Sequence, residues 1–458
     1  MKYLTPQIIA EVTGGKFVGD ISARSIRVMG ASKDDREVRP GNLFICIHGA
    51  RVDGHSFANS AFESGAACCL AEHTIPNAQG PYILVASTIA AVKELGGFYR
   101  SLFDIPIIGI TGSVGKTTTK EMTASVLGAK FKVLKTQENM NNELGVPLTL
   151  LSLDASHEAA VVEMGISEFG AMSRLAKMVR PGICTITKIG YSHIETLGSL
   201  RGVLKAKSEV FKYMDQNGVA VLNGDDELLQ KYDPGMRKIL FGLGEHNDIR
   251  AENIRANSTR EVLFDIVSDK GRFEASVPSY GNHLAPAALA AAAAGRLLGL
   301  TDEEITRGLL AYSPVSGRAN VTDTGFITLI DDRYNANPNS VKSALSSLSA
   351  LPKRHVAILG DMLELGSQSE QLHRDTGAYA ARNGVDCLIC CGNMAEFTYE
   401  GYVSAGGNFA YFYPIKDELI TAIPELIKEG DAVLVKASHG MKFEELLPVL
   451  IRTGQVIS

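Results

Sequence analysis

The sequence has no tryptophan, few cysteines and no apolar run long enough to cross a membrane. Its seven cysteines are odd in number and irregularly spaced, so we expect reduced thiols rather than a disulfide framework. The longest apolar stretch, residues 284–295, ends at Arg296 and falls short of the roughly 18 residues of a spanning helix. The first 15 residues lack the apolar core and cleavage site of a signal peptide. We therefore predict a cytoplasmic protein without a membrane span.

A surplus of positive charge is also absent. The chain carries 45 Lys and Arg against 51 Asp and Glu, which gives a formal net charge of −6. General nucleic-acid binders are usually basic, so we expect no nucleic-acid partner. A nucleotide ligand is compatible with this charge, since a phosphate site needs only local positive charge. The length of 458 residues allows two or three domains.

Three regions follow one another along the chain. Residues 1–103 mix short strands with turns. Residues 104–313 open with the apolar run DIPIIGIT and then alternate helical and strand-like segments. Residues 314–458 repeat the alternation with four apolar strands, each ending in Gly, Asp or Lys. Such alternation indicates parallel sheets covered by helices. We therefore predict an α/β fold with a mixed N-terminal domain, a central parallel-sheet domain and a Rossmann-like, doubly wound C-terminal domain.

A CxxCC run in the third region has two interpretations. Cys387, Cys390 and Cys391 lie among apolar residues, as in a buried strand. A metal or redox site is the alternative, but no second Cys or His pair lies at zinc-ligand spacing. We therefore favour the buried strand.

The strongest local signal is the segment GITGSVGKTTTKE, which follows an apolar strand and opens a helical pattern. Glycines let backbone N–H groups turn inward around phosphate oxygens, Lys116 brings positive charge, and Thr117 can offer its hydroxyl to Mg²⁺. The strict GxxxxGK[ST] spacing is not met, because Ile110 stands where it requires glycine. A chance glycine-rich turn is the alternative to an ATP or GTP site. The predicted nucleotide contacts of this loop are Gly112, Ser113, Gly115, Lys116, Thr117 and Thr118.

Polar residues after the next strands are candidates for metal binding. Glu163 ends an apolar strand of the same predicted sheet, where a carboxylate can hold Mg²⁺, although a solvated loop residue is the plain alternative. His193 could serve as a neutral ligand or be a structural histidine. Lys205 and Lys207 fall on different faces of a predicted helical segment, and the pattern alone favours two solvated lysines.

Two loops rich in amides and carboxylates suit ligand contact. Asn139, Asn141 and Asn142 lie within four positions, which suits recognition of an amide- or sugar-rich substrate as well as an ordinary turn. Asp332 and Asn335 follow a strand of the third region, where doubly wound sheets bind ligands.

Taken together, these motifs resemble the Mur ligases, which add amino acids to the peptidoglycan precursor, and their relatives that glutamylate folate. The resemblance rests on GITGSVGKTTTKE, TQENMNNELGVPLTLL, DDRYNANPNS and LGDMLELG, and it spans nearly the whole chain. The first region, with DDREVRPGNLFICIHGARVDGHSF, is similar to the UDP-sugar-binding domain of some members.

The resemblance implies an ATP-dependent ligase that activates a carboxylate as an acyl phosphate and couples it to an amine. The motifs favour the branch that joins UDP-MurNAc-tripeptide to D-alanyl-D-alanine, acting as a monomer with ATP and Mg²⁺. Another amino-acid ligase of the superfamily is the first alternative. A P-loop switch protein, which uses nucleotide to control a partner, is the second.

The resemblance also implies roles for individual residues. Catalysis would involve Lys116, Lys207 and His193, with Lys207 as a carbamate. The metal ligands would be Thr117, Glu163, His193 and the Lys207 carbamate. Further ATP contacts would come from Asn282, Arg318, Asp332 and Asn335. The muramoyl-peptide and UDP contacts would be Asp34, Arg36, Asp53, Gly54, His55, Asn139, Asn141 and Asn142. Three positions depart from the family's usual residues, namely Asp35, Ala287 and His439.

Overall fold

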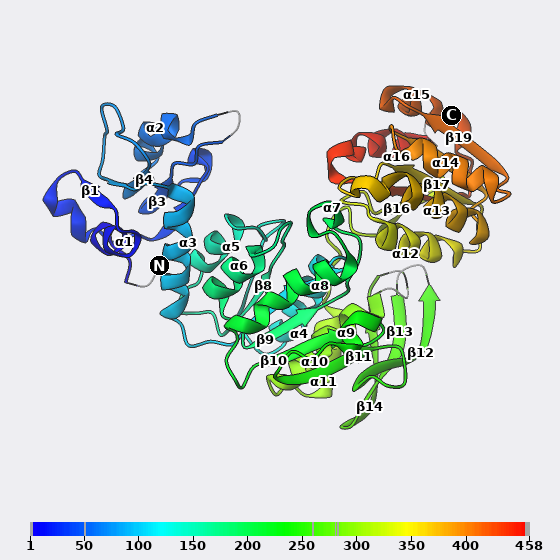
Figure 1. The fold of residues 1–458 in the computed structure, drawn as a ribbon, viewed down its shortest axis with the longest axis horizontal. Helices are drawn as coiled ribbons and strands as arrows, with labels where there is room; N and C mark the ends of the chain where they lie inside the picture. The colour runs from blue at the N-terminus through cyan, green and yellow to red at the C-terminus, as the bar shows by residue number, and fades with distance from the viewer. Residues whose placement is uncertain (1–2, 50–51, 259–260, 280, 282–283, 454–458) are drawn as a thin grey trace.

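The computed structural model describes residues 3–49, 52–258, 261–279, 281 and 284–453. These residues form three β-sheets with helices packed against them, one sheet after another along the chain (Figure 1). The predicted α/β fold with three domains is confirmed. Within the described residues, no helix is both long and apolar enough to cross a bilayer.

The N-terminal sheet has the strand order β1-β5-β4-β3-β2, in which only the β1–β5 pair is antiparallel. Its strands are β1 (Lys16–Val18), β2 (Gly30–Ser32), β3 (Asn42–Ile45), β4 (Cys68–Ala71) and β5 (Tyr82–Leu84). The helices of this region are α1 (Pro6–Thr13), α2 (Ala58–Glu63) and α3 (Thr88–Ser101). A single apolar cluster joins this domain to the next, since it contains Leu43, Tyr99, Val146 and Leu175. The boundary at residues 103 and 104 stays a prediction.

The central sheet has the order β14-β13-β12-β11-β10-β9-β6-β8-β7. Pairing is parallel from β7 to β12, as predicted for the buried apolar runs. The parallel strands are β6 (Ile107–Thr111), β7 (Val133–Lys135), β8 (Ala159–Glu163), β9 (Ile183–Ile186), β10 (Val219–Asn223) and β11 (Arg237–Gly242). An antiparallel extension, which the sequence patterns did not predict, is formed by β12 (Ile249–Ser258), β13 (Glu261–Ser268) and β14 (Gly271–Val277). Alternating burial along β13 and the short β13–β14 turn explain this pairing, because one face of the extension is partly solvated.

Helices of the central domain hold the loop after β6 in place. The first of them, α4 (Lys116–Gly128), packs against α10 (Ala285–Leu297) and α11 (Asp302–Leu310). The alanine-rich α10 is almost entirely buried, which allows this close packing. The remaining helices are α5 (Gly145–Leu151), α6 (Ala171–Val179), α7 (Ile194–Leu197), α8 (Leu200–Ser208) and α9 (Glu227–Lys231).

The C-terminal sheet has the order β15-β16-β20-β17-β18-β19 and is parallel except for β15–β16. Apolar clusters lie on both of its faces, which confirms the doubly wound architecture. Its strands are β15 (Asn320–Asp323), β16 (Thr328–Asp331), β17 (His355–Gly360), β18 (Cys387–Cys391), β19 (Phe409–Tyr413) and β20 (Ala432–Lys436). Its helices are α12 (Pro338–Ser349), α13 (Ser369–Arg382), α14 (Ala395–Ser404), α15 (Lys416–Leu426) and α16 (Leu447–Arg452). The CxxCC run forms β18 with all three cysteines buried, so the strand interpretation is confirmed.

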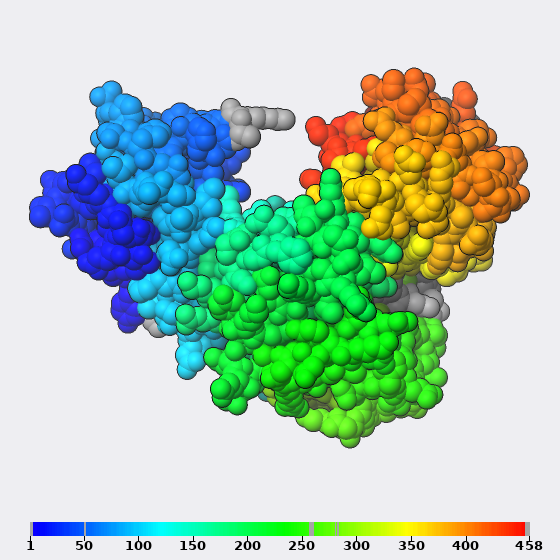
Figure 2. All heavy atoms as spheres, viewed as in Figure 1, coloured from blue at the N-terminus to red at the C-terminus, as the bar shows by residue number. Residues whose placement is uncertain are grey.

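The N-terminal and C-terminal domains stand on either side of a broad hollow above the central domain (Figure 2). Between the central and C-terminal domains the carboxyl ends of parallel strands from two sheets come together. This is the place where open α/β sheets bind ligands.

Candidate active site

The loop between β6 and α4 has the geometry of a phosphate cradle. Gly115 precedes α4 with a φ of 82°, and within the described residues no side chain caps this helix. The first N–H groups of α4 are therefore available to an anion, and the helix dipole favours negative charge there. Gly112 has a φ of 147°, and a Cβ at this position would overlap Thr187 Oγ1. Only glycine fits there without displacing the neighbouring strand end.

Lys116 lies at the mouth of this loop and is half-buried. Its Nζ donates a hydrogen bond to Gly112 O at 3.0 Å. Burial lowers the pKa of Lys116; the nearby Glu163 opposes that shift and Arg318 adds to it. The amine is thus held beside one carboxylate and one further cation, in a site from which water is partly removed.

Glu163 is a buried carboxylate, 1% exposed, at the carboxyl end of β8. Its Oε1 accepts a hydrogen bond from Asn141 Nδ2 at 2.8 Å. Its Oε2 is buried and, among the described residues, has no hydrogen-bond partner. A buried carboxylate oxygen without a hydrogen-bond partner destabilises the fold unless a cation binds to it. Carboxylate and hydroxyl oxygens are what Mg²⁺ prefers, so Glu163 together with Thr117 fits a magnesium site.

Lys207 lies on α8 and is only 2% exposed. The expectation of a solvated lysine, drawn from the pattern alone, is therefore wrong for Lys207, whereas Lys205 is exposed. The difference arises because α8 buries the face that carries Val203, Ala206 and Lys207. Burial, with a smaller effect of Lys116, lowers the pKa of Lys207 well below its usual value. In the described part of the chain no carboxylate forms an ion pair with this amine.

His193 precedes α7 and lines the same cavity as Lys116 and Glu163. Its Nδ1 lies 2.7 Å from Oε2 of Glu364, which belongs to the C-terminal domain. Burial lowers the pKa of His193; Glu364 opposes this shift, while Lys207 and Lys116 add to it.

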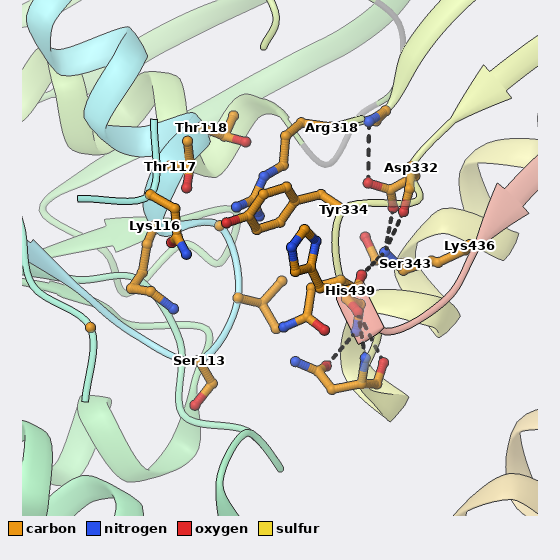
Figure 3. A pocket seen from close by; sticks show the side chains of 18 of the residues that line it. Ser113, Lys116, Thr117, Thr118, Arg318, Asp332, Tyr334, Ser343, Lys436 and His439 are labelled. Carbon is orange, nitrogen blue, oxygen red and sulfur yellow. Dashed lines mark hydrogen bonds and ion pairs between the residues drawn. The ribbon is translucent and has the colours of Figure 1, made fainter. Parts of the chain in front are cut away.

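The C-terminal domain contributes a cation to the cavity from the opposite side. Arg318 Cζ lies 3.7 Å from the ring centroid of Tyr334, which fixes the guanidinium by stacking. In Figure 3 these two side chains lie together and face Lys116 and Thr117. Arg318 Nε is buried and has no hydrogen-bond partner among the described residues, so it is ready to bind an anion. His439, one of the departures from the family pattern, lies 5.3 Å from Tyr334 between ring centroids.

The other two predicted residues of this domain make internal contacts. Asp332 accepts hydrogen bonds from Lys436 Nζ at 2.6 Å and from Ala319 N at 3.2 Å, so it holds the loop that carries Arg318. Asn335 accepts from the same lysine through its backbone carbonyl. Tyr334 and Lys436 were not among the site residues predicted from the sequence. Lys436 ends strand β20, so the strand-end rule that found Glu163 could have found it.

Most of the predicted site residues line one cavity of about 380 Å³ between the central and C-terminal domains. The predicted residues in its lining are Ser113, Gly115, Lys116, Thr117, Thr118, Asn139, Asn141, Asn142, Glu163, His193, Arg318, Asp332 and Asn335. Within the asparagine loop, Asn141 orients Glu163, and Asn142 Oδ1 accepts from the backbone N–H groups at the start of α5. Asn282 lies outside the described residues.

The predicted UDP contacts lie in the N-terminal domain, away from this cavity. Asp34 and Arg36 pair with each other at 2.6 Å, and the arginine lowers the pKa of Asp34 to about 2. Arg36 is largely exposed and can meet a second anion. Gly54 donates its N–H to Ile47 O at 2.8 Å, and a side chain here would press against that backbone.

Asp53, His55 and His73 form the one cluster of three His, Cys, Asp or Glu side chains in the described residues whose ligand atoms all lie within 4.8 Å of one another. Asp53 Oδ1 accepts from His55 Nδ1 at 2.6 Å, and His55 Nε2 accepts from Glu72 N–H at 2.8 Å. Both ring nitrogens of His55 thus take part in hydrogen bonds that hold the loop in place. Neither nitrogen has a free lone pair for a metal ion.

Family models and known proteins match this chain over almost its full length. Three family models match. The model described as "Mur ligase family, catalytic domain" matches residues 30–96, and the model described as "Mur ligase middle domain" matches residues 110–295. The model described as "Mur ligase, glutamate ligase domain" matches residues 317–439. The UDP-N-acetylmuramoyl-tripeptide–D-alanyl-D-alanine ligase of Bacillus subtilis (strain 168) is 35% identical over 456 residues, 98% of each chain. The enzyme of the same name from Escherichia coli (strain K12) is 32% identical and covers 95% of this chain and 96% of its own.

Solved structures give the same result. A crystal structure of MurF from Acinetobacter baumannii superposes with a TM-score of 0.88, at 30% identity over 98% of each chain. MurF ligase from Thermotoga maritima, in complex with ADP, gives a TM-score of 0.83 at 27% identity, covering 94% of this chain and 99% of that one.

Proposed function

Because this chain belongs to the Mur ligase family, we propose that it joins UDP-MurNAc-tripeptide to D-alanyl-D-alanine at the expense of ATP, in the synthesis of the peptidoglycan precursor. One observation carries the proposal. A single cavity brings the P-loop, an incompletely paired buried carboxylate and the Arg318 guanidinium together between two domains. Such a site suits the reaction of two anions, a nucleotide phosphate and a carboxylate.

The chain's own cations make that reaction feasible. Negative charge builds on the transferred phosphoryl group as it approaches the substrate carboxylate. Lys116, once its Nζ leaves Gly112 O for a phosphate oxygen, and the N-terminus of α4 would stabilise that charge from the central domain. Arg318 would do so from the C-terminal domain. The amine then attacks the resulting acyl phosphate and expels phosphate, and closure of the two domains keeps water from hydrolysing it.

Thr117, Glu163 and His193 would hold Mg²⁺, together with Lys207 as its carbamate. The unpartnered Glu163 Oε2 supports this assignment. When bound, Mg²⁺ neutralises charge on the phosphoryl oxygens.

The buried state of Lys207 supports the carbamate. Addition of CO₂ requires the neutral amine; a bond forms between Nζ and carbon, and one proton leaves. Burial favours this neutral form, since the charged amine is poorly solvated there. The carbamate adds a negative charge near Lys116, which would attract the Lys116 ammonium group.

The remaining contacts concern the substrate. Asn139, Asn141 and Asn142 would meet the muramoyl-peptide, and the exposed Arg36 would meet the uridine diphosphate. Asp34, Asp53, Gly54 and His55 would shape that second site. We also propose domain boundaries at residues 103/104 and 313/314, a monomeric state and a cytoplasmic location.

A ligation assay tests the function. Purified protein is incubated with ATP, Mg²⁺ and UDP-MurNAc-tripeptide, with either D-alanyl-D-alanine or single amino acids as the amine. We expect phosphate release and a pentapeptide product only when the tripeptide and D-alanyl-D-alanine are both present. Equal rates with single amino acids would favour another ligase of the superfamily, and release that needs neither substrate would favour a nucleotide switch.

A further inference from the structure

The C-terminal domain contacts one short segment of the central domain, residues 190–195. Asn337 Nδ2 donates to Ser192 Oγ at 2.9 Å, and Ser192 Oγ in turn donates to Ser113 O in the P-loop at 3.1 Å. Tyr191 packs against the apolar core of the C-terminal domain. Figure 1 shows α7, which begins inside this segment, reaching to the C-terminal domain. Docking of the third domain is thus transmitted directly to residues beside the phosphate cradle.

His193 lies in the middle of this contacted segment and has an unusual backbone conformation. Its φ is 57°, in the left-handed region that residues other than glycine rarely adopt. Its partner Glu364 has the same feature, with a φ of 63°, and a Cβ added at the nearby Gly366 would lie 3.3 Å from the Glu195 side chain. Backbone strain of this kind persists where the surrounding structure fixes it, and it is common at functional sites.

The contact between the two side chains settles which nitrogen of His193 carries the proton. Nδ1 faces the Glu364 carboxylate at 2.7 Å, and a carboxylate oxygen can only accept, so Nδ1 is the donor. In the neutral ring the lone pair is then on Nε2. Because His193 lines the cavity beside Lys116 and Glu163, Nε2 is the nitrogen available to a ligand there.

We propose that Glu364 is a positioning residue for the reaction, which sets the tautomer and ring orientation of His193 so that Nε2 can bind the divalent cation. Metal-bound histidines commonly donate their other N–H to a carboxylate in this way. Here that carboxylate comes from a different domain, so the metal site is complete only when the C-terminal domain is docked. The inference rests on the proposed role of His193 as a metal ligand.

The test uses Mn²⁺ as the probe, bound to the full-length protein with saturating ADP. Electron paramagnetic resonance measures the Mn²⁺ affinity, and electron spin echo modulation from ¹⁴N reports directly whether a histidine nitrogen is a ligand. The variants are Glu364→Ala and Glu364→Gln. The control is Glu370→Gln, an exposed glutamate of the same domain at the start of α13.

We expect Glu364→Ala to weaken Mn²⁺ binding by about 10- to 100-fold and to reduce the ¹⁴N modulation. Glu364→Gln should fall between this variant and wild type, because its amide oxygen still accepts from Nδ1–H, and Glu370→Gln should match wild type. A Glu364→Ala affinity within about twofold of wild type, with unchanged ¹⁴N modulation, overturns the proposal. If Glu364→Ala does not fold by circular dichroism, the Gln variant decides by the same readouts.

His193→Ala separates this proposal from the metal assignment beneath it. If His193→Ala abolishes the ¹⁴N modulation and Glu364→Ala leaves it intact, His193 is a ligand and Glu364 does not position it. If His193→Ala leaves both readouts unchanged, the metal assignment itself is wrong, and the proposal for Glu364 falls with it.

Discussion

Replacing Lys116 by alanine removes the lysine that opens the helix of the phosphate cradle, and Coulomb's law gives the scale of the effect. A charge about 4 Å from a phosphate oxygen, at the effective dielectric of a partly buried site, contributes about 4 kcal/mol. Loss of a single preorganised donor in other enzymes costs about 2.7 to 4 kcal/mol. Arg318 already lowers the pKa of Lys116, so removing the lysine also relieves some repulsion. We therefore expect a loss of about 3 kcal/mol in kcat/KM, roughly two orders of magnitude.

The same change should hardly affect folding. The one hydrogen bond of the Lys116 amine goes to Gly112 O, and in the described residues no ion pair involves it. The assay is steady-state ligation with D-alanyl-D-alanine, alongside thermal unfolding of the same preparation. Lys205→Ala is the matched control, since Lys205 is exposed and lies 5.9 Å from the ring of Phe169. A folded Lys116→Ala enzyme with near wild-type kcat/KM would refute the assignment of the phosphate cradle.

Three further predictions concern Lys207 and the glycines. Lys207→Ala should lose ligation activity, and added bicarbonate should not restore it; a highly active variant would contradict the carbamate. With CO₂ removed, Lys207→Met should unfold at a higher temperature than wild type near neutral pH. The pKa of Lys207 is lower in the folded than in the unfolded protein, so burying this lysine lowers the free energy of unfolding at any pH below the unfolded pKa of about 10.4. The loss is about 1.4 kcal/mol for each pH unit below that pKa until the folded pKa is reached, and it vanishes as the pH rises through about 10.4. Equal melting at pH 7 would refute this. Gly112→Ala should destabilise by more than about 1 kcal/mol in denaturant unfolding, whereas Gly128→Ala, which meets no atom within 4 Å, should not; equal effects would contradict the described turn.

Local sequence signals were sufficient for the parts of the site that one segment encodes. The β6–α4 loop was predicted because a buried strand, glycines, a lysine and a helix follow one another directly in the chain. Glu163 was predicted because parallel strands of one sheet end at the same edge. The strands of the third domain are covered by helices on both faces of the sheet, so each is a continuous apolar run. Such runs can be recognised in the sequence.

Interactions between segments that are distant in the chain leave no local sequence pattern. The burial of Lys207 depends on which face of α8 packs inward, and its own sequence is compatible with two exposed lysines. Glu364 approaches His193 only through docking of the third domain, so no pattern around either residue reveals the pair. The orienting hydrogen bond from Asn141 to Glu163 likewise joins a loop to a strand end. The antiparallel β12–β14 extension was not predicted, because the alternation of helical and strand-like segments along residues 104–313 indicates parallel pairing.

Transfer of oxygen from the substrate carboxylate tests the central claim most directly. UDP-MurNAc-tripeptide is labelled with ¹⁸O in its terminal carboxylate and converted with ATP and D-alanyl-D-alanine, and the released phosphate is analysed by mass spectrometry. An acyl phosphate formed in this cavity predicts that one ¹⁸O atom appears in each phosphate released. Phosphate free of ¹⁸O, formed at an undiminished rate, would contradict the account.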